Sequence, residues 1–424
     1  MTGSPDNLIE TPHSEVGGVI AASNDGGGEQ RPAAPDTALS RALELIHTRY
    51  GEPLDIDMLA RSAGISRTAL CNRFLTQLGD PPMRYCTRWR LRQAAERLRE
   101  GPESIAEVAY QVGFGSEAAF NRAFKRQFGK PPASWRRLAR SELPDLPRQQ
   151  VRSCLTRDGT RLAWSAVGEG MPLVKTANWL NHLEFDWISP IWRHWLVELL
   201  RDHRVIRYDE RGNGLSDWDV PRLSFDDFVE DLEVVVDEAG IERFDLFAIS
   251  QGAAVAIAYS LKHPQRVRRM VLLGGYARGW TLRLSGEDLA RREAMVVLSR
   301  TGWGSDNPAF RQMFSSLYIP GGTPEQFDWF NELQRISTSP ENAERLQRVL
   351  GGIDVSKLLE KVSVPTLVAH AKGDQIIPFA CGEELARGIP GAEFVPLEGH
   401  NHILLADEPA WPQFLGAMRS FLAR

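Results

Sequence analysis

The sequence lacks the features that would place it in several large classes of protein. No apolar run reaches the roughly 18 residues that a membrane-spanning helix needs, and the N-terminus lacks the basic start and apolar stretch of a secretion signal. The 424 residues include four cysteines without CxxC pairs or metal-ligand spacing, which predicts reduced thiols rather than a disulfide framework. There is no phosphate-binding loop. We therefore expect a cytoplasmic protein that holds no metal or organic cofactor and makes no membrane contact.

The sequence has an average globular composition and an uneven distribution of charge. Hydrophobic residues make up 42% and charged residues 25%, close to the average for soluble proteins, and the length suggests two or three domains. Between residues 36 and 140, 18 Lys or Arg residues stand against 11 Asp or Glu, a surplus of seven positive charges. Because the whole chain carries −5, the remainder carries −12. This asymmetry indicates that the basic part meets nucleic acid and the acidic part does not.

Changes in composition divide the chain into four segments. Residues 1–35 are rich in Gly, Ser, Pro, Asn and Asp without helical or strand periodicity, and we expect them to be disordered. Residues 36–140 carry apolar side chains at helical spacing. Residues 141–150 contain two prolines, which break helix continuation and mark a linker. Over residues 151–424 short apolar strands alternate with helices, which is typical of a largely parallel sheet.

Two units of similar pattern make up the helical segment, over residues 54–74 and 104–124. In each, a short helix runs into a glycine suited to the left-handed conformation of a tight turn, and a following serine caps the next helix. Ser104 and Glu107 also have capping-box spacing. A long arginine-rich helix is expected between the units, over 83–99. The turn glycine, capping serine and two inward-facing side chains are Gly64, Ser66, Leu70 and Phe74 in unit one, and Gly113, Ser116, Phe120 and Phe124 in unit two.

Together with the segment FGKPPASWR at residues 128–136, this arrangement resembles the DNA-binding domain of the AraC family of transcription regulators. The resemblance covers roughly residues 40–138, and Trp135 stands where the family usually has Tyr. It implies an all-α domain in which each unit places a recognition helix in the major groove, with the long helix holding the units on successive grooves. Double-stranded DNA is therefore the expected partner.

The exposed first half of each recognition helix supplies the candidate base readers. Asn can pair with adenine, Arg with guanine, and Glu can accept from cytosine. Basic side chains on and near these helices are expected to contact phosphates. The expected readers are Arg67, Thr68 and Asn72 in unit one, and Glu117, Ala118, Asn121 and Arg122 in unit two; the expected phosphate contacts are Arg73, Lys125, Arg126 and Lys130.

In the C-terminal part, an apolar strand runs directly into a helix of small residues with Ser250 at the junction. A nucleophilic serine on such a sharp turn needs small neighbours, and Ala248 and Gly252 meet this need. Upstream, residues 209–216 read DERGNGLS. These segments resemble the α/β-hydrolase family. The resemblance covers residues 155–424, and it implies a mostly parallel sheet with helices on both faces and a helical lid, so that the whole chain is multidomain.

The family resemblance also implies a triad in the chain order serine, acid, histidine. Asp374 follows an apolar strand and a glycine turn, as the acid does in this family. Two histidines follow the next strand. His402 has the family's spacing to Pro409, whereas His400 directly follows a glycine, which is also a family habit. We expect His402 to be the base that Asp374 orients, with His400 as the alternative. The remaining alternative is a packed turn in which Ser250 is incidental.

Two further parts of a hydrolase site are predicted. The oxyanion hole should combine the backbone N–H of Gln251 with one from the loop after the strand at Leu173. The usual His-Gly pair is absent from this loop, and Asn178 or Trp179 would donate instead. Residues from about 279 to 359 form an aromatic-rich helical insertion that we expect to act as a lid, with most of its rings in the lid core and some lining an apolar pocket.

Three functions fit this sequence. The first is a DNA-binding transcriptional regulator whose C-terminal domain hydrolyses or senses a small apolar ester-like molecule. The second is a catalytically silent ligand sensor, and the third is a hydrolase with a vestigial DNA-binding module; the intact capping and turn residues argue against the third. A homodimer is left open, with the hydrolase half as its candidate interface.

Overall fold

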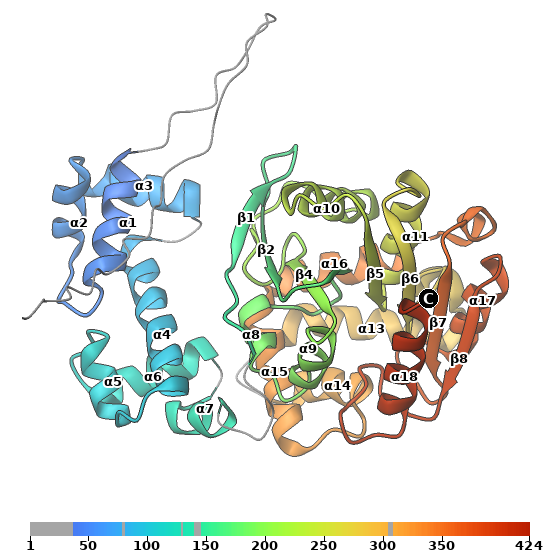
Figure 1. Cartoon of the computed structure of the whole chain (residues 1–424). Helices are drawn as coiled ribbons and strands as arrows, with labels where there is room; N and C mark the ends of the chain where they lie inside the picture. The colour runs from blue at the N-terminus through green and yellow to red at the C-terminus, as the bar shows by residue number, and fades with distance from the viewer. Residues whose placement is uncertain (1–36, 79–80, 129, 140–145, 304–307) are drawn as a thin grey trace, which may run out of the picture.

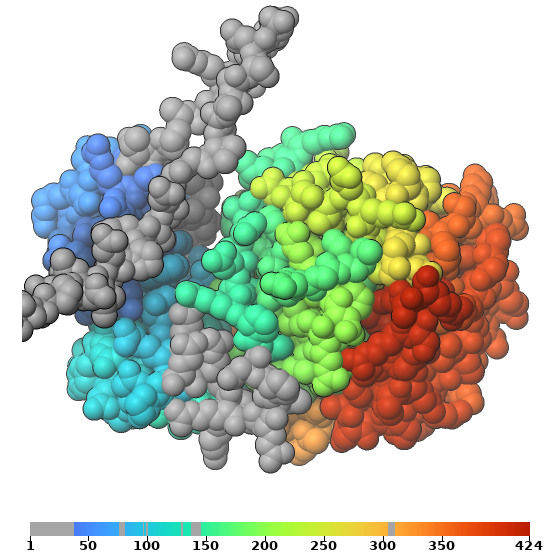
Figure 2. Space-filling model, viewed as in Figure 1, coloured from blue at the N-terminus to red at the C-terminus, as the bar shows by residue number. Residues whose placement is uncertain are grey.

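The computed structural model describes residues 37–78, 81–128, 130–139, 146–303 and 308–424. The predicted disordered segment 1–35 and the first half of the predicted linker lie outside these ranges. Figure 1 shows a helical N-terminal part joined to a larger part built on one eight-stranded sheet. In Figure 2 the two parts, blue to cyan and green to red, adjoin each other.

The N-terminal part has two small cores joined by one long helix. Cys86 of α4 contributes to the first core, and Leu91, Ala94 and Leu98 of the same helix contribute to the second. The α4 side chain Arg90 also donates to the carbonyls of Tyr50, Glu52 and Gly113, and so joins the two units. The helices are α1 (Thr37–Arg49), α2 (Ile56–Ala63), α3 (Arg67–Leu78), α4 (Pro82–Glu100), α5 (Ile105–Gln111), α6 (Glu117–Phe128) and α7 (Pro132–Ala139).

The predicted turns and caps of both units are confirmed. Gly64 and Gly113 have φ of 71° and 84°, in the left-handed region that glycine tolerates. The Ser104–Glu107 capping box is formed at the start of α5. The serine hydroxyls that precede the recognition helices each accept a backbone N–H at 3.2 Å; these are Ser66, from Ala69, and Ser116, from Ala119.

The sheet of the C-terminal part has the strand order β1-β2-β4-β3-β5-β6-β7-β8. The β1–β2 and β2–β4 pairs are antiparallel and all other pairs are parallel. Every residue of the central strand β5 is buried, as in sheets covered on both faces. The strands are β1 (Arg152–Leu155), β2 (Arg161–Val167), β3 (Met171–Lys175), β4 (His203–Asp209), β5 (Phe244–Ile249), β6 (Val267–Leu273), β7 (Thr366–Ala371) and β8 (Glu393–Leu397).

Helices cover both faces of the sheet. Phe244 of β5 contacts Tyr259 of α11, whereas Phe247 contacts Trp195 of α9 and Phe414 of α18. Side chains an odd number of positions apart along a strand point to opposite faces, so α11 and the α9–α18 pair lie on different sides. The helices outside the lid are α8 (Leu183–Trp187), α9 (Arg193–Leu199), α10 (Phe225–Glu238), α11 (Gly252–Lys262), the 3-10 helix η1 (Ser356–Lys361), α17 (Phe379–Gly388) and α18 (Ala410–Leu422).

The predicted lid region is helical and lies between β6 and β7 in the chain. Trp303, Trp329 and Phe330, among other rings, are buried in it. Within the described ranges no helix combines the length and the apolar character needed to cross a bilayer. The lid helices are α12 (Trp280–Arg283), α13 (Gly286–Gly302), α14 (Pro308–Tyr318), α15 (Pro324–Ser337) and α16 (Pro340–Gly352).

Candidate active site and DNA-binding surface

Ser250 lies on a strained turn between β5 and α11. Its φ is +59°, and among the described residues it is the one non-glycine residue with a positive φ. Such a conformation costs an L-residue about 1–2 kcal/mol, and it persists where the surrounding structure imposes it. The Ser250 N–H donates to the Leu273 carbonyl of β6 at 3.0 Å, which fixes the turn against the neighbouring strand. The strand-turn-helix predicted around this serine is present.

Glycine next to this turn permits a close approach of the β3 loop. A Cβ added at Gly252 would lie 2.9 Å from the Ala177 carbonyl oxygen and would also meet the Thr176 hydroxyl. Thr176 and Ala177 of this loop therefore lie against the first residue of α11. This position, beside Ser250, is where the backbone donors of an oxyanion hole are needed.

Asp374 and His402 meet beside this turn. Asp374 follows β7, His402 follows β8, and His402 Nδ1 lies 2.6 Å from Asp374 Oδ2. The other carboxylate oxygen of Asp374 accepts the N–H groups of Ile376 and Ile377 at 2.8 and 2.9 Å. Gly274, after β6, packs against the histidine, because a Cβ there would lie 3.2 Å from His402 Cε1. Four segments far apart in the sequence thus converge.

The electrostatics of this pair suit an oriented base. Burial alone would raise the pKa of Asp374, but the charge and hydrogen bond of His402, aided by His370 and the Ile377 N–H, hold that pKa below its usual value. The acid therefore stays ionised near neutral pH and accepts a proton-bearing Nδ1. His402 Nε2 is buried and has no hydrogen-bond partner among the described residues, so it is the nitrogen free to receive a proton.

His400, the alternative base, has different surroundings. It is exposed, and it packs against Gly373, where an added Cβ would meet its Nδ1. The two histidines are separated by Asn401, whose side-chain oxygen accepts the Gly321 N–H at 2.9 Å. The structure therefore brings His402, and not His400, to the Asp374 carboxylate.

Two side chains at the pair were not assigned a role from the sequence. His370, on the buried strand β7, lies 3.6 Å from Asp374 Oδ2 and 2.9 Å from the Ile377 carbonyl oxygen through Nε2. Tyr318, at the end of α14, accepts the His402 N–H with its carbonyl oxygen at 2.9 Å, and its ring contacts the histidine ring at a centroid distance of 5.5 Å. A histidine within an apolar strand was the available signal for His370, and the aromatic pattern of the lid was the signal for Tyr318.

The candidate oxyanion loop is anchored by buried polar groups. The Lys175 ammonium group contacts the Asn178 side-chain oxygen and lies 5.1 Å from the centroid of the Trp192 ring. Burial lowers the pKa of Lys175 to about 7, against the opposing charge of Asp186. Gln251 is also buried, and its amide nitrogen and oxygen have no partner among the described residues. Lys175 thus holds the Asn178 side chain and leaves the loop backbone as the source of donors.

Aromatic rings connect the lid to the histidine. Trp179 of the β3 loop stacks on Trp303 of the lid at 5.4 Å and contacts Tyr318 at 6.3 Å. Tyr318 in turn contacts Phe330 at 5.5 Å as well as His402. An apolar wall from the lid therefore adjoins the candidate catalytic pair.

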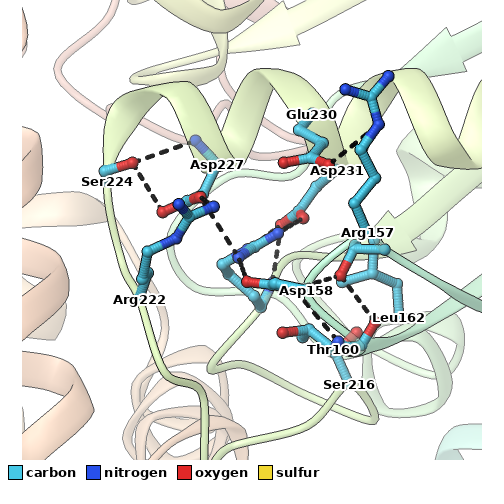
Figure 3. A network of polar contacts seen from close by, with 12 residues as sticks. Arg157, Asp158, Thr160, Leu162, Ser216, Arg222, Ser224, Asp227, Glu230 and Asp231 are labelled. Atoms are coloured by element: carbon cyan, nitrogen blue, oxygen red, sulfur yellow. Dashed lines mark hydrogen bonds and ion pairs between the residues drawn. The ribbon is translucent and has the colours of Figure 1, made fainter.

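The DERGNGLS segment forms a turn held by a buried arginine. Arg211 is fully buried and contacts Asp231 at 2.6 Å, Asp158 at 2.9 Å and Asp227 at 3.6 Å. Figure 3 shows these three carboxylates converging from the loop before β2 and from α10. The turn is therefore held in place by the buried ion pairs of Arg211. An open pocket at this network includes none of the predicted catalytic residues; it is lined by Arg157, Asp158, Pro221, Arg222 and Glu230.

The predicted DNA-binding residues lie on and beside α3 and α6. Arg67 forms an ion pair with Asp57 of α2, so its guanidinium is partly engaged within unit one. Lys130, in the turn after α6, pairs with Glu325 of the lid at 3.2 Å. The exposed members of the set are Arg67, Thr68, Asn72, Glu117, Ala118, Arg122, Lys125 and Arg126; the half-buried members are Arg73, Asn121 and Lys130.

Comparison with known proteins supports the helical domain first. A model of a helix-turn-helix domain of AraC type matches residues 59–138. A putative AraC-like transcription regulator of Streptomyces lividans is 40% identical over 102 residues, which are 24% of this chain and 34% of that protein. The chain thus spans about a third of the length of this relative.

A model of the alpha/beta hydrolase fold matches residues 183–409, more than half of the chain. The chain belongs to the α/β-hydrolase fold family. The AB hydrolase superfamily protein YisY of Bacillus subtilis is 28% identical over 251 residues, 58% of this chain and 90% of that protein. The esterase EaEST of Exiguobacterium antarcticum has the same fold as the α/β-hydrolase domain, with a TM-score of 0.55, 23% identity, and coverage of 65% of this chain and 100% of that one.

Proposed function

We propose that this chain is a transcriptional regulator that binds double-stranded DNA through its two helix-turn-helix units and hydrolyses a small apolar ester-like molecule in its α/β-hydrolase domain. Ser250 is the nucleophile, His402 is the base, and Asp374 orients the histidine. DNA binding would then report on the small molecule.

The proposed hydrolase activity is supported by two features that lie next to each other, the strained turn at Ser250 and the His402–Asp374 pair. Ser250 has the positive φ of a nucleophile elbow, and next to this turn His402 Nδ1 lies 2.6 Å from Asp374 Oδ2. The nearby Gly274 packs against both the histidine and the acid, with added-Cβ distances of 3.2 and 3.6 Å. A packed turn with an incidental serine would require neither the strained serine nor the buried histidine–carboxylate pair.

The proposed reaction proceeds through an acyl-enzyme. Ser250 Oγ attacks the ester carbonyl while its proton moves to His402 Nε2, and the carbonyl oxygen becomes an oxyanion. The N–H groups of Gln251 and of Asn178 or Trp179 stabilise that oxyanion. The intermediate collapses when His402 returns the proton to the departing alcohol. Water, deprotonated by the same histidine, then releases the acid and restores Ser250.

The proposed DNA binding is supported by the same set of structural features in both helix-turn-helix units. Each has its left-handed glycine, its capping serine and a recognition helix with an exposed first half. The relative of Streptomyces lividans, described as an AraC-like transcription regulator, supports the same function. In this proposal Asn72, Glu117 and Arg122 read base edges, and Lys125 and Arg126 contact phosphates.

One observation favours a second candidate, a ligand sensor without turnover. The β3 loop lacks the His-Gly pair usual in this family, and its Asn178 side chain is held by Lys175. An oxyanion hole with one poorly placed donor loses about 10²–10³ in rate. In such a protein the pocket would bind its ligand and shift the DNA-binding equilibrium without chemistry.

The test is turnover of short-chain p-nitrophenyl esters by the full chain and by Ser250→Ala, with Ser153→Ala on the exposed edge strand β1 as a matched control. We expect Ser250→Ala to lose on the order of 10⁶ in turnover and the control to match wild type. Equal turnover by wild type and Ser250→Ala would overturn the assignment of the nucleophile. If all three proteins fold, bind duplex DNA and hydrolyse nothing, the sensor becomes the better description.

A further inference from the structure

Two segments of the α/β-hydrolase domain contact the helix-turn-helix domain. On α8, Glu184 pairs with Arg92 of α4 at 2.9 Å, and Ile188 after α8 packs against the apolar core of unit two. On α15, Glu325 pairs with Lys130 at 3.2 Å. Arg335, near the other end of α15, donates to the carbonyl of Arg126 on recognition helix α6. In Figure 1, α8 and α15 lie on the side of the sheet domain nearest to α4, α6 and α7.

The same two segments lead to the candidate catalytic site. Helix α8 follows the loop that carries Asn178 and Trp179, the candidate oxyanion donors. Helix α15 carries Phe330, which contacts Tyr318, the residue whose ring contacts His402. The two segments are also joined to each other, because Phe185 of α8 stacks on Trp329 of α15 at 4.3 Å and 16°.

Lys130 is where this connection meets the DNA-binding surface. It follows the second recognition helix, and its position makes it an expected phosphate contact. With Glu325 beside it, only 14% of its side chain is exposed. A lysine ammonium held by a carboxylate is not free to neutralise a phosphate at full strength, so Glu325 and the DNA backbone compete for one cation.

We infer that lid helix α15 is a docking surface for the second helix-turn-helix unit, and that it competes with duplex DNA for Lys130. The lid position found here weakens DNA binding, and a ligand that moves α15 relative to His402 changes DNA affinity through Glu325 and Arg335. This inference rests on the proposed function, since it joins the proposed hydrolase site to the proposed DNA site.

The first experiment isolates the lid contact without a ligand. Binding of the full chain to a fluorescein-labelled 30-base-pair duplex of random sequence is measured by anisotropy at about 50 mM salt, where phosphate contacts dominate. Glu325→Gln removes the carboxylate that holds Lys130. Asp328→Asn is the matched control, because it removes the same charge from the same helix at an exposed residue that has no ion pair among the described residues. We expect Glu325→Gln to tighten binding about two- to fivefold more than the control does.

A double-mutant comparison separates competition from a change in overall charge. In a Lys130→Gln background the Glu325→Gln substitution should have no effect beyond that of Asp328→Asn, because the shared cation is gone. Equal effects of Glu325→Gln and Asp328→Asn in the wild-type background would overturn the competition while leaving DNA binding in place.

The second experiment tests the connection to the pocket. A p-nitrophenyl alkylphosphonate is expected to lose p-nitrophenolate as Ser250 Oγ bonds to phosphorus and its proton passes to His402, and the adduct is confirmed by mass. We expect the adduct to change duplex affinity by about threefold or more, and the change to disappear in Glu325→Gln. If the adduct forms and the affinity for the duplex is unchanged, the proposed link between the pocket and the DNA-binding surface is wrong, whereas the competition for Lys130 is unaffected. A failure to form the adduct would count against the proposed nucleophile, and the Glu325 comparison would still decide the lid contact.

Discussion

Two histidines two positions apart show how strongly the local environment decides a residue's role. His402 is 2% exposed, and its Nδ1 is bound to Asp374. His400 is exposed and packs against Gly373. A general base needs one nitrogen fixed and the other free, and this requirement is met at His402.

This difference gives a prediction with a built-in control. His402→Ala is expected to reduce kcat on the best p-nitrophenyl ester by about 10⁴-fold or more, because it removes the proton acceptor for Ser250. His400→Ala is expected to stay near the wild-type rate. The two rates are compared in proteins whose thermal unfolding matches wild type. A loss at His400→Ala as large as at His402→Ala would contradict the assignment of the base.

Glu210 carries a pH-dependent cost to stability. It is 3% exposed, and burial, together with the negative charges of Asp231 and Asp209, raises its pKa to about 8, against the opposing charges of Lys175 and Arg211. Because its folded-state pKa lies above the ordinary value of 4.5, the folded protein holds the proton more tightly than the unfolded chain does. The stabilisation that the folded state gains from protonated Glu210 is therefore fully present below about pH 4.5. This stabilisation is lost as the pH rises through about 8.

Glu210→Gln should remove this dependence. Between pH 5 and pH 9 the free energy of unfolding of the variant is expected to rise relative to that of wild type by on the order of 4 kcal/mol. The measurement is urea unfolding across that range, with the exposed Glu238→Gln as a control for loss of one charge. A difference between Glu210→Gln and wild type that stays constant with pH would show that Glu210 titrates normally.

The sequence was sufficient to predict Ser250, Asp374 and a pair of histidines, because each follows a strand in a recognisable pattern. It favoured His402 and kept His400 as an alternative, because the final choice depends on how the loop after β8 packs against Tyr318 and Gly373. The roles of His370 and Lys175 were not predicted. Both are polar residues in buried strands, and their partners come from distant segments that a linear pattern does not bring together.

At the scale of elements, the two helix-turn-helix turns look equivalent in sequence and differ in packing. An added Cβ at Gly64 would meet only an Arg41 side-chain nitrogen, at 3.9 Å. At Gly113 it would lie 2.7 Å from the Tyr50 carbonyl oxygen and 3.0 Å from Arg90 Cζ. Because Arg90 is the side chain that links the two units, the turn at Gly113 also contributes to the contact between them.

We therefore expect Gly64→Ala and Gly113→Ala to have unequal effects. The first should cost about 1–2 kcal/mol from backbone strain alone, and the second a further 1–3 kcal/mol from overpacking. The two costs in stability are measured by hydrogen exchange of the α2–α3 and α5–α6 peptides in the full chain. Equal protection losses in the two variants would contradict the packing difference.

Element prediction was accurate where the periodicity was strong. The helix expected over 83–99 is Pro82–Glu100, and the strand before Ser250 is Phe244–Ile249. Strand β1 was not predicted, because it is a four-residue edge strand with one buried side chain and so has no apolar run. Helix α8 was also missed, since its five residues are too few to show a helical period.

At the scale of the whole molecule, the basic and acidic portions of the chain fold into different domains. Between residues 36 and 140 the chain has a surplus of seven positive charges, and exposed Lys125 and Arg126 lie on the second recognition helix. Binding to duplex DNA is therefore expected to release counterions and to weaken with salt.

Lys125→Gln should lower the slope of log K against log salt concentration by about 0.9, the value for one lost phosphate contact, and should weaken binding equally on unrelated sequences. Lys361→Gln, at an exposed lysine of the α/β-hydrolase domain, is the control and should leave the slope unchanged. Anisotropy titrations between about 50 and 200 mM salt give both slopes. Identical slopes for the two variants would show that Lys125 does not contact a phosphate.

The ion pair between Lys130 and Glu325 also has a consequence for the small molecule. Coupling between two binding sites is reciprocal, so a ligand that changes DNA affinity by some factor has its own affinity changed by DNA by the same factor. In the proposed coupling, duplex DNA would thereby act as an effector of the hydrolase domain. Protein bound to its target sequence and protein free of DNA would then bind the ligand at different ligand concentrations. The fraction of protein bound to DNA would set the ligand concentration at which the pocket fills.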